Sequence, residues 1–153
     1  MDEGYQAQRR AFRNRAHQAL VLDQVPRNRA GEPGILEVFS PQKPSKDHWT
    51  TLRCGTSAYH IALLIDTLHG RIGIEFYVPD DKEIGHKAIE NAVLFEEELG
   101  LTAKPFDAKK ASGLRFCKDG CKIKDNEEAW GGFIEQQLRW ALEMKRVIDE
   151  LGL

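Results

Sequence analysis

Two stretches in the middle of the chain alternate between hydrophobic and polar residues with a period of two, which is the main sequence sign of a strand. They are "AYHIALLI" at 58–65 and "RIGIEFYV" at 71–78. The apolar positions of the two stretches are Tyr59, Ile61, Leu63, Ile65, Ile72, Ile74, Phe76 and Val78. The other face of the second stretch carries Arg71, Gly73, Glu75 and Tyr77. Because "DTLHG" between them is typical of a turn, the pattern predicts a hairpin with one apolar and one polar face.

Three longer stretches repeat their hydrophobic residues at helical spacing. They cover residues 5–22, 83–99 and 125–152. Gly100 follows the second stretch and is a natural helix terminator. In the third stretch, Asp125 and Glu128 have the spacing of a capping box, which predicts that this helix begins at Asp125.

Shorter patterns indicate further strands. "ILEVFS" at 35–40 and "HWTTLR" at 48–53 are both typical of short strands. "LRFCKDGCKIK" at 114–124 predicts a second hairpin, because Asp119-Gly120 is a strong tight-turn dipeptide. Hairpins rather than helices would then connect the strands, so the sheet should be mainly antiparallel.

The fold class predicted from these elements is α+β: a mainly antiparallel sheet built from two hairpins, with three main helices packed on its apolar face. The 153 residues suit a single domain, 1–153. Its parts are an N-terminal helix within 1–25, a sheet over 35–124 with an inserted helix at 83–99, and a C-terminal helix at 125–152.

Composition is that of a globular protein, with 41% hydrophobic and 30% charged residues. No apolar run reaches the roughly 18 residues of a membrane span, and the N-terminus has no apolar segment typical of a signal peptide. We therefore expect a cytoplasmic protein without membrane contact. Cys54, Cys117 and Cys121 should then be reduced thiols. Cys117 and Cys121 flank a turn, but two further zinc ligands are missing from the pattern, and no metal site is predicted.

The net charge of −2 conceals two basic groups, one in the first helix and one around the second hairpin. Basic side chains with aromatic residues between them suit a phosphate backbone. The candidate nucleic-acid contacts are Arg9, Arg10, Arg13, Lys109, Lys110 and Arg115. The alternative is a solvated surface, because several Asp and Glu residues follow closely in the sequence.

"YVPDDKEIGHK" and "FDAKK" together contain the residue types of a metal-dependent nuclease. Such an enzyme needs two carboxylates for a divalent cation and a lysine to orient water. The candidates for these catalytic roles are Asp80, Asp107 and Lys109, with Glu75 as a further carboxylate. The alternative is structural, because Pro79 and Asp81 suit the end of a strand and the N-cap of the next helix.

A family resemblance extends over nearly the whole chain. "HWTTLRCGTSAYHIALLI" places a tryptophan and a glycine ahead of an alternating strand. Then come "IEFYV", a helix ending in "FEEELG", the segment "DAKKASGL" and a last helix with Trp130 and Trp140. In this order of motifs the chain resembles the prokaryotic domain-of-unknown-function family 4268, in which the domain often follows a restriction-endonuclease-like domain or stands alone. The resemblance implies a link to DNA handling or phage defence, and no reaction.

Together these patterns favour a non-catalytic binding or interaction domain that contacts nucleic acid or a partner protein, without a cofactor. One alternative is a metal-dependent, nuclease-like hydrolase that uses Asp80, Asp107 and Lys109 with Mg²⁺. Another is a structural protein without a ligand, in which "ILEVF" as an edge strand, or the last helix, forms a homodimer.

Overall fold

The computed structural model describes residues 3–25, 31–41 and 50–153. The helices are α1 (Glu3–Val21), α2 (Ile35–Val38), α3 (Lys82–Glu90), α4 (Ala92–Leu99) and α5 (Trp130–Glu150), with a single 3₁₀ turn at Glu127–Ala129. The strands are β1 (Ser40–Pro41), β2 (Thr50–Arg53), β3 (His60–Asp66), β4 (Arg71–Val78), β5 (Lys104–Asp107) and β6 (Ser112–Lys118).

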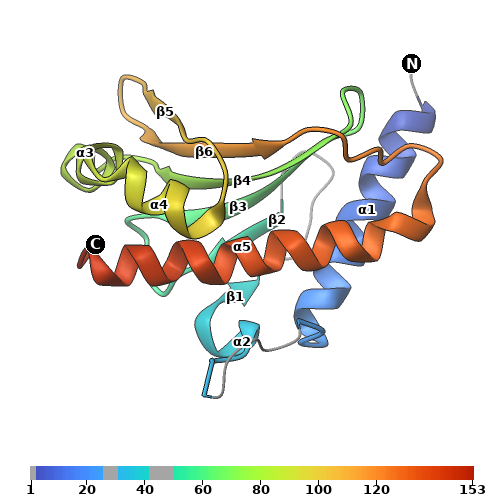
Figure 1. The fold of residues 1–153 in the computed structure, drawn as a ribbon, viewed down its shortest axis with the longest axis horizontal. Coiled ribbons are helices and arrows are strands. Elements are labelled where there is room, and N and C mark those ends of the chain that lie inside the picture. Colours follow the sequence, from blue (N-terminus) through green and yellow to red (C-terminus); the bar gives the residue numbers. More distant parts are fainter. Residues whose placement is uncertain (1–2, 26–30, 42–49) are drawn as a thin grey trace.

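The strands form one antiparallel sheet in the order β1-β2-β3-β4-β6-β5. The long helix α5 runs across one face of this sheet, with α4 beside it and α1 crossing its N-terminal end (Figure 1). In the described ranges no helix covers the opposite face, which we call the open face (Figure 1). The predicted α+β class, with its antiparallel sheet and helices on the apolar face, is therefore confirmed.

The hydrophobic core lies between the sheet and these helices. The alternation predicted for β3 and β4 is confirmed, since the side chains expected on the apolar face are buried. Three phenylalanines from β4, α4 and β6 lie in sequence across the core, with Phe76–Phe95 centroids 6.2 Å apart and Phe95–Phe116 centroids 6.4 Å apart. Trp130 and Trp140 of α5 are buried as well. One side of the sheet is therefore mainly apolar, and the other side faces the solvent.

Residues 35–40 form the short helix α2 and the start of β1, so the strand predicted there is wrong. The β-branched composition favoured a strand, but Ile35 and Phe39 are both buried and stand four residues apart, which is helical spacing. The Ile35 N–H also donates to the carboxylate of Asp23, 3.3 Å away. Packing at this site therefore overrides local strand propensity.

The second hairpin was predicted at the wrong place. β6 pairs with β5, which precedes it, and the turn between them is closed by the Ala108 N–H donating to the Ala111 carbonyl at 2.8 Å. Gly120 does turn the chain, with a φ of +74°, but the residues after it do not pair back on β6. Instead the Cys121 N–H donates to the Gly70 carbonyl at 2.7 Å, beside the turn between β3 and β4.

Two helix boundaries also differ from the prediction. Asn91 interrupts the helix predicted at 83–99 and divides it into α3, which packs on β6, and α4, which packs on α5. The predicted capping box at Asp125 is wrong, because α5 begins at Trp130 and Asp125 has a left-handed φ of +54°. Both the N–H and the carboxylate of Asp125 are bonded to the Gln8 side chain of α1.

Both outer strands of the sheet are short and contain a proline. β1 has two residues and includes Pro41, and β5 has four residues and includes Pro105. Of the strand predicted at 48–53, residues 48 and 49 lie outside the described ranges, and β2 occupies the rest. No helix in the described part of the chain is long and apolar enough to span a bilayer.

Candidate binding site on the open face

The register of the sheet aligns polar and aromatic residues of five strands in one row across the open face. Arg53 of β2 pairs with His60 of β3, and His60 pairs with Tyr77 of β4. Tyr77 pairs with Gly113 of β6, and Gly113 pairs with Phe106 of β5. Paired residues on neighbouring strands point to the same face of a sheet. Three aromatic rings therefore share this face, and we call His60, Tyr77 and Phe106 the ring row.

Gly113 brings Phe106 and Tyr77 together although their strands are not neighbours. A Cβ at Gly113 would lie 1.9 Å from the Phe76 carbonyl oxygen and 2.9 Å from the edge of the Phe106 ring, so no side chain fits there. The Phe106 ring occupies the free space instead. The sheet thus has a continuous aromatic row at a position where one strand contributes no side chain.

The three rings stack on one another along the row. The His60 and Tyr77 centroids are 5.1 Å apart with 28° between the ring planes, and the Tyr77 and Phe106 centroids are 5.9 Å apart at 30°. All three side chains are half-buried, so part of each ring stays exposed to solvent. Burial lowers the pKa of His60 below its usual value, which keeps its ring neutral near pH 7. The row is therefore an uncharged aromatic surface.

A second row, two residues along the strands, carries charge. Glu75 of β4 pairs in register with Arg115 of β6, which pairs with Lys104 of β5. The Glu75 carboxylate is 7% exposed, and the Arg115 guanidinium lies 2.7 Å from it. Arg115 also lies 5.9 Å from the centre of the Phe106 ring, a cation–π arrangement. Glu75, proposed from the sequence as a catalytic carboxylate, is thus neutralised by an arginine.

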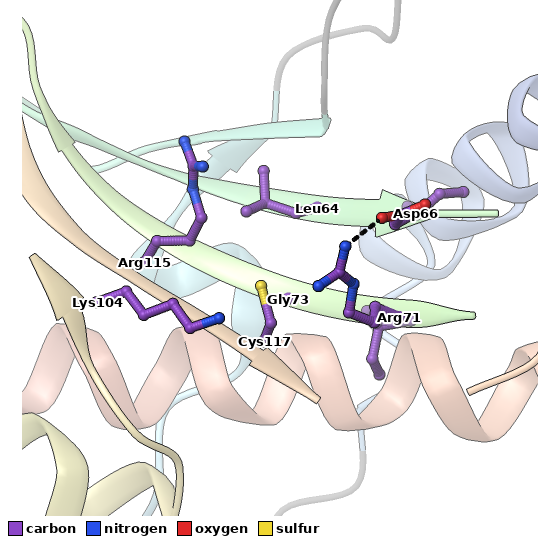
Figure 2. Close-up of a pocket in the computed structure, with 9 residues that line it drawn as sticks. Leu64, Asp66, Arg71, Gly73, Lys104, Arg115 and Cys117 are labelled. Carbon is purple, nitrogen blue, oxygen red and sulfur yellow. Dashed lines mark hydrogen bonds and ion pairs between the residues drawn. The ribbon is translucent and has the colours of Figure 1, made fainter. Parts of the chain in front are cut away.

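Two hollows open on this face. One, of about 490 Å³, lies beside Arg53 and His60 at the end of the ring row. The other has a volume of about 280 Å³, and we call it the Gly73 hollow (Figure 2). Its lining includes Asp66, Arg71, Gly73, Lys104, Arg115 and Cys117. Both hollows are bordered by cationic side chains, which gives the open face positive charge at separate points.

Asp107 and Asp80, two of the carboxylates proposed for a nuclease, differ in their contacts. Asp107 accepts a hydrogen bond from the Lys82 ammonium and lies 3.0 Å from Nε2 of His86, and both partners come from α3. The Lys82 hydrogen bond lowers the pKa of Asp107, so this carboxylate is ionised at neutral pH. Asp80 is exposed just after β4, and Lys109 is exposed in the turn between β5 and β6.

Asp81, next to Asp80, accepts a hydrogen bond from the Ile84 N–H at 3.2 Å and is the N-cap of α3. The structural interpretation of "PDDK" as the end of a strand and a helix cap is thus confirmed. In the part of the chain that the structure describes, no three His, Cys, Asp or Glu side chains are gathered as metal ligands would be.

The basic residues predicted for nucleic-acid binding are not gathered in one place. Arg9, Arg10 and Arg13 belong to α1, at the opposite end of the molecule from the β5–β6 hairpin (Figure 1). Arg13 is buried and Arg10 is exposed. Lys109 and Lys110 lie in the turn of that hairpin.

Arg115 is the one predicted contact within the charged row of the open face. The sequence interpretation missed the ring row and Arg53 beside it, whereas Lys104 belongs to the basic group that it placed around the second hairpin. Alternation did place Tyr77 on the polar face, which was a usable signal. Phe106 was missed because "FDAKK" was interpreted as a catalytic motif and not as strand β5.

The cysteines take no part in a covalent link, since Cys54, Cys117 and Cys121 are all free thiols. Burial raises the pKa of Cys54 to about 11 and also raises that of Cys121. Cys117 is different, because its side chain lines the Gly73 hollow (Figure 2).

Comparison with known proteins gives a family and no closer relative. No curated protein and no solved structure matches the chain significantly. The family model described as "Domain of unknown function (DUF4268)" matches residues 23–151. This match includes the whole sheet and every helix except α1. The resemblance noted in the sequence is confirmed: the chain belongs to the DUF4268 family.

Proposed function

We propose that the open face binds single-stranded nucleic acid, with bases against the ring row and phosphates near the cations around it. The observation that carries the proposal is the stacked row of His60, Tyr77 and Phe106 on a sheet face that no described helix covers. Aromatic side chains on an exposed sheet are a common platform for unpaired bases, because every base has a π-face.

The size of the row suits a short stretch of strand. Neighbouring strands lie about 4.8 Å apart, so the three spacings from β3 to β5 span roughly 14 Å. This length matches a few nucleotides. The hollow beside Arg53 and His60 extends the row at one end and offers room for a further base.

The charge of the open face also favours an anionic ligand. Its two buried or half-buried carboxylates, Glu75 and Asp66, are each paired with an arginine. Arg53 and Lys104 have no carboxylate partner within ion-pair distance among the described residues. The face thus has cations left over for phosphates, although the net charge of the chain is −2.

A single strand fits this site better than a duplex. In a duplex the base faces are stacked inside, and proteins read the exposed edges from the grooves. In the described structure the ring row presents aromatic surface and no protruding helix. Stacking of unpaired bases, with little sequence preference, is therefore the interaction that the open face supports. We further propose that this binding takes place in the cytoplasm, because three free thiols suit a reducing compartment. A role in DNA handling or defence is part of the same proposal.

Fluorescence anisotropy with labelled 12-nucleotide DNA and RNA strands tests the proposal. Phe106→Leu keeps apolar bulk over Gly113 and removes the ring, and we expect it to weaken binding roughly fivefold or more, because stacking contributes about 1–3 kcal/mol per base. Arg53→Ala should weaken binding as well, most strongly at low salt.

Arg10→Ala is the matched control, because Arg10 is an exposed arginine of α1 at the other end of the molecule. We expect this variant to bind like the wild type. The proposal is wrong if neither strand binds at low salt, or if Arg10→Ala weakens binding as much as Arg53→Ala does. Magnesium-dependent cleavage of the strand that is lost in Asp107→Ala would support a hydrolase instead. Dimers in light scattering without any strand binding would support a structural role.

A further inference from the structure

We infer that the Gly73 hollow binds a phosphate group. The inference deepens the proposed function, because this phosphate would belong to the strand that lies on the open face. It rests on four features of the hollow: its shape, its floor, the cations at its sides and the balance of charge around it.

The hollow exists because its central position has no side chain. Leu64, Gly73 and Cys117 are aligned in register on β3, β4 and β6. A Cβ at Gly73 would lie 2.5 Å from the Phe116 carbonyl oxygen and 3.3 Å from the Cys117 sulfur. Glycine is therefore required there, and a space of about 280 Å³ remains between the charged side chains on either side. This volume is large enough for a phosphate and part of its sugar.

The floor of the hollow is held from the core side. Gln137 of α5 is fully buried, and its amide nitrogen donates to the Leu64 carbonyl at 2.7 Å and to the Gly73 carbonyl at 3.0 Å. These two carbonyl oxygens are thus engaged by the helix. Neither oxygen needs a hydrogen bond from a ligand, and the Gln137 amide offsets their partial negative charge before an anion enters.

Cations stand on two sides of the hollow. In Figure 2 the Lys104 ammonium and the Arg71 guanidinium extend toward the Cys117 sulfur from opposite sides, and Arg115 points away from it. Arg71 is held in place by the Asp66 carboxylate, 2.8 Å away, and lies 3.7 Å from Asp119. A guanidinium has five N–H donors, so these contacts leave others for a ligand.

The side chains that line the hollow are positive on balance, with Arg71, Lys104 and Arg115 against one carboxylate, Asp66. Beyond the lining, Glu75 pairs with Arg115, and Asp119 lies 3.7 Å from Arg71. Lys104 is the cation of the lining without an ion pair, since no described carboxylate lies within ion-pair distance of it. The oriented Arg71 guanidinium and the Lys104 ammonium face each other over an uncharged floor. Together they form a site for phosphate oxygens, which accept several charge-assisted hydrogen bonds at once.

Protection of Cys117 from alkylation tests this site in the intact chain. Iodoacetamide is uncharged, and peptide mass spectrometry reports each cysteine separately. Cys54 and Cys121 should react slowly because burial raises their pKa, and they serve as internal references. We expect inorganic phosphate to slow the alkylation of Cys117 and to leave the two references unchanged, compared with chloride at the same ionic strength.

Two lysine variants locate the effect. Lys104→Met removes the ammonium and keeps the length of the side chain, and we expect the phosphate concentration for half protection to rise roughly tenfold, as for the loss of a hydrogen bond to a charged group. Lys118→Met is the matched control, because Lys118 is an exposed neighbour of Cys117 that alternation places on the opposite face of β6. In this control variant, phosphate should protect Cys117 as it does in the wild type.

Labelled strands with and without a 5′-phosphate identify the source of the phosphate. Protection only by the phosphorylated strand indicates a terminal phosphate, and equal protection by both strands indicates an internal one. The inference is wrong if neither inorganic phosphate nor a bound strand protects Cys117, or if Lys118→Met loses protection as Lys104→Met does. If a strand binds and does not protect Cys117, the proposed function stands and the phosphate site in the Gly73 hollow is wrong. If phosphate protects Cys117 and no strand binds, the phosphate site stands and the proposed function is wrong.

Discussion

Charged side chains on the open face are fixed by hydrogen bonds to their neighbours. Asp66 at the end of β3 is the clearest case, because its carboxylate accepts from the Arg71 guanidinium and from the backbone N–H of His69, and lies 2.8 Å from the His69 ring nitrogen. Burial alone would raise the pKa of Asp66, but the hydrogen bonds from Arg71 and His69 outweigh it and lower the pKa to about 2. The Asp66 carboxylate is therefore ionised in the folded chain at neutral pH.

This carboxylate should make stability depend on pH in the acid range. The pKa of Asp66 is about 2 in the folded chain and near 3.8 in the unfolded chain, so the unfolded chain binds the proton more readily. The stabilisation is present above pH 4 and is lost as the pH falls toward 2. Because the side chain is about one-third exposed, we expect only about 1 kcal/mol or less.

Thermal unfolding of wild type and Asp66→Asn between pH 2 and 7 measures the effect. The difference in melting temperature should be largest near neutral pH and should shrink below pH 4. A difference that stays constant down to pH 2 would contradict the assigned pKa.

At the scale of elements, the approach of α3 to β6 depends on one small residue from each. A Cβ added at Gly85 of α3 would lie 1.7 Å from the Ser112 hydroxyl and 2.7 Å from the Ser112 Cβ. Both residues are buried. The helix that carries Lys82 and His86 can therefore approach the sheet only while these two positions stay small.

Gly85→Ala should accordingly destabilise the fold by about 1–3 kcal/mol, the usual cost of overpacking. Gly132→Ala is the control, because Gly132 lies in α5 with no neighbouring atom within 4 Å of its added Cβ. That change should stabilise by about 0.5–1 kcal/mol, since alanine favours a helix. Adding Ser112→Gly to Gly85→Ala should recover part of the loss in urea unfolding. No recovery would mean that the loss has another origin.

At the scale of the whole molecule, the basic helix α1 and the β5–β6 hairpin lie at opposite ends (Figure 1). A short strand on the open face would therefore meet the cations of the sheet and not those of α1. With about three phosphates neutralised, the logarithm of the binding constant should fall with the logarithm of salt at a slope of about −2.

The salt dependence of binding checks this arrangement. Arg53→Ala should make the slope shallower by about 0.7, the value for one phosphate contact on a single strand. Arg10→Ala should leave it unchanged. A wild-type slope near −5, reduced by Arg10→Ala, would show that α1 contributes to the interface.

The sequence predicted those parts of the fold that repeat a pattern over many residues. The alternation of β3 and β4 was long enough to assign both faces, and the helical spacing of α1 and α5 was equally regular. The strand predicted at 35–40 and the second hairpin were wrong because distant contacts decide these short segments, whereas the short strand β2 was predicted correctly over its described residues. The deciding contacts include the burial of Ile35 in α2 and the hydrogen bond of Cys121 to Gly70. The ring row was beyond reach for the same reason, since it depends on the pairing of Gly113 with both Tyr77 and Phe106.

The two prolines in the outer strands have a consequence for the behaviour of the protein in concentrated solution. A sheet grows into a fibril when the N–H and C=O groups of an outer strand pair with a strand of another molecule. Pro41 and Pro105 have no N–H to offer, and the two strands that contain them are only two and four residues long. Both rims of this six-stranded sheet are therefore poor templates for fibril growth, although its middle strands have the β-branched composition of aggregation-prone segments.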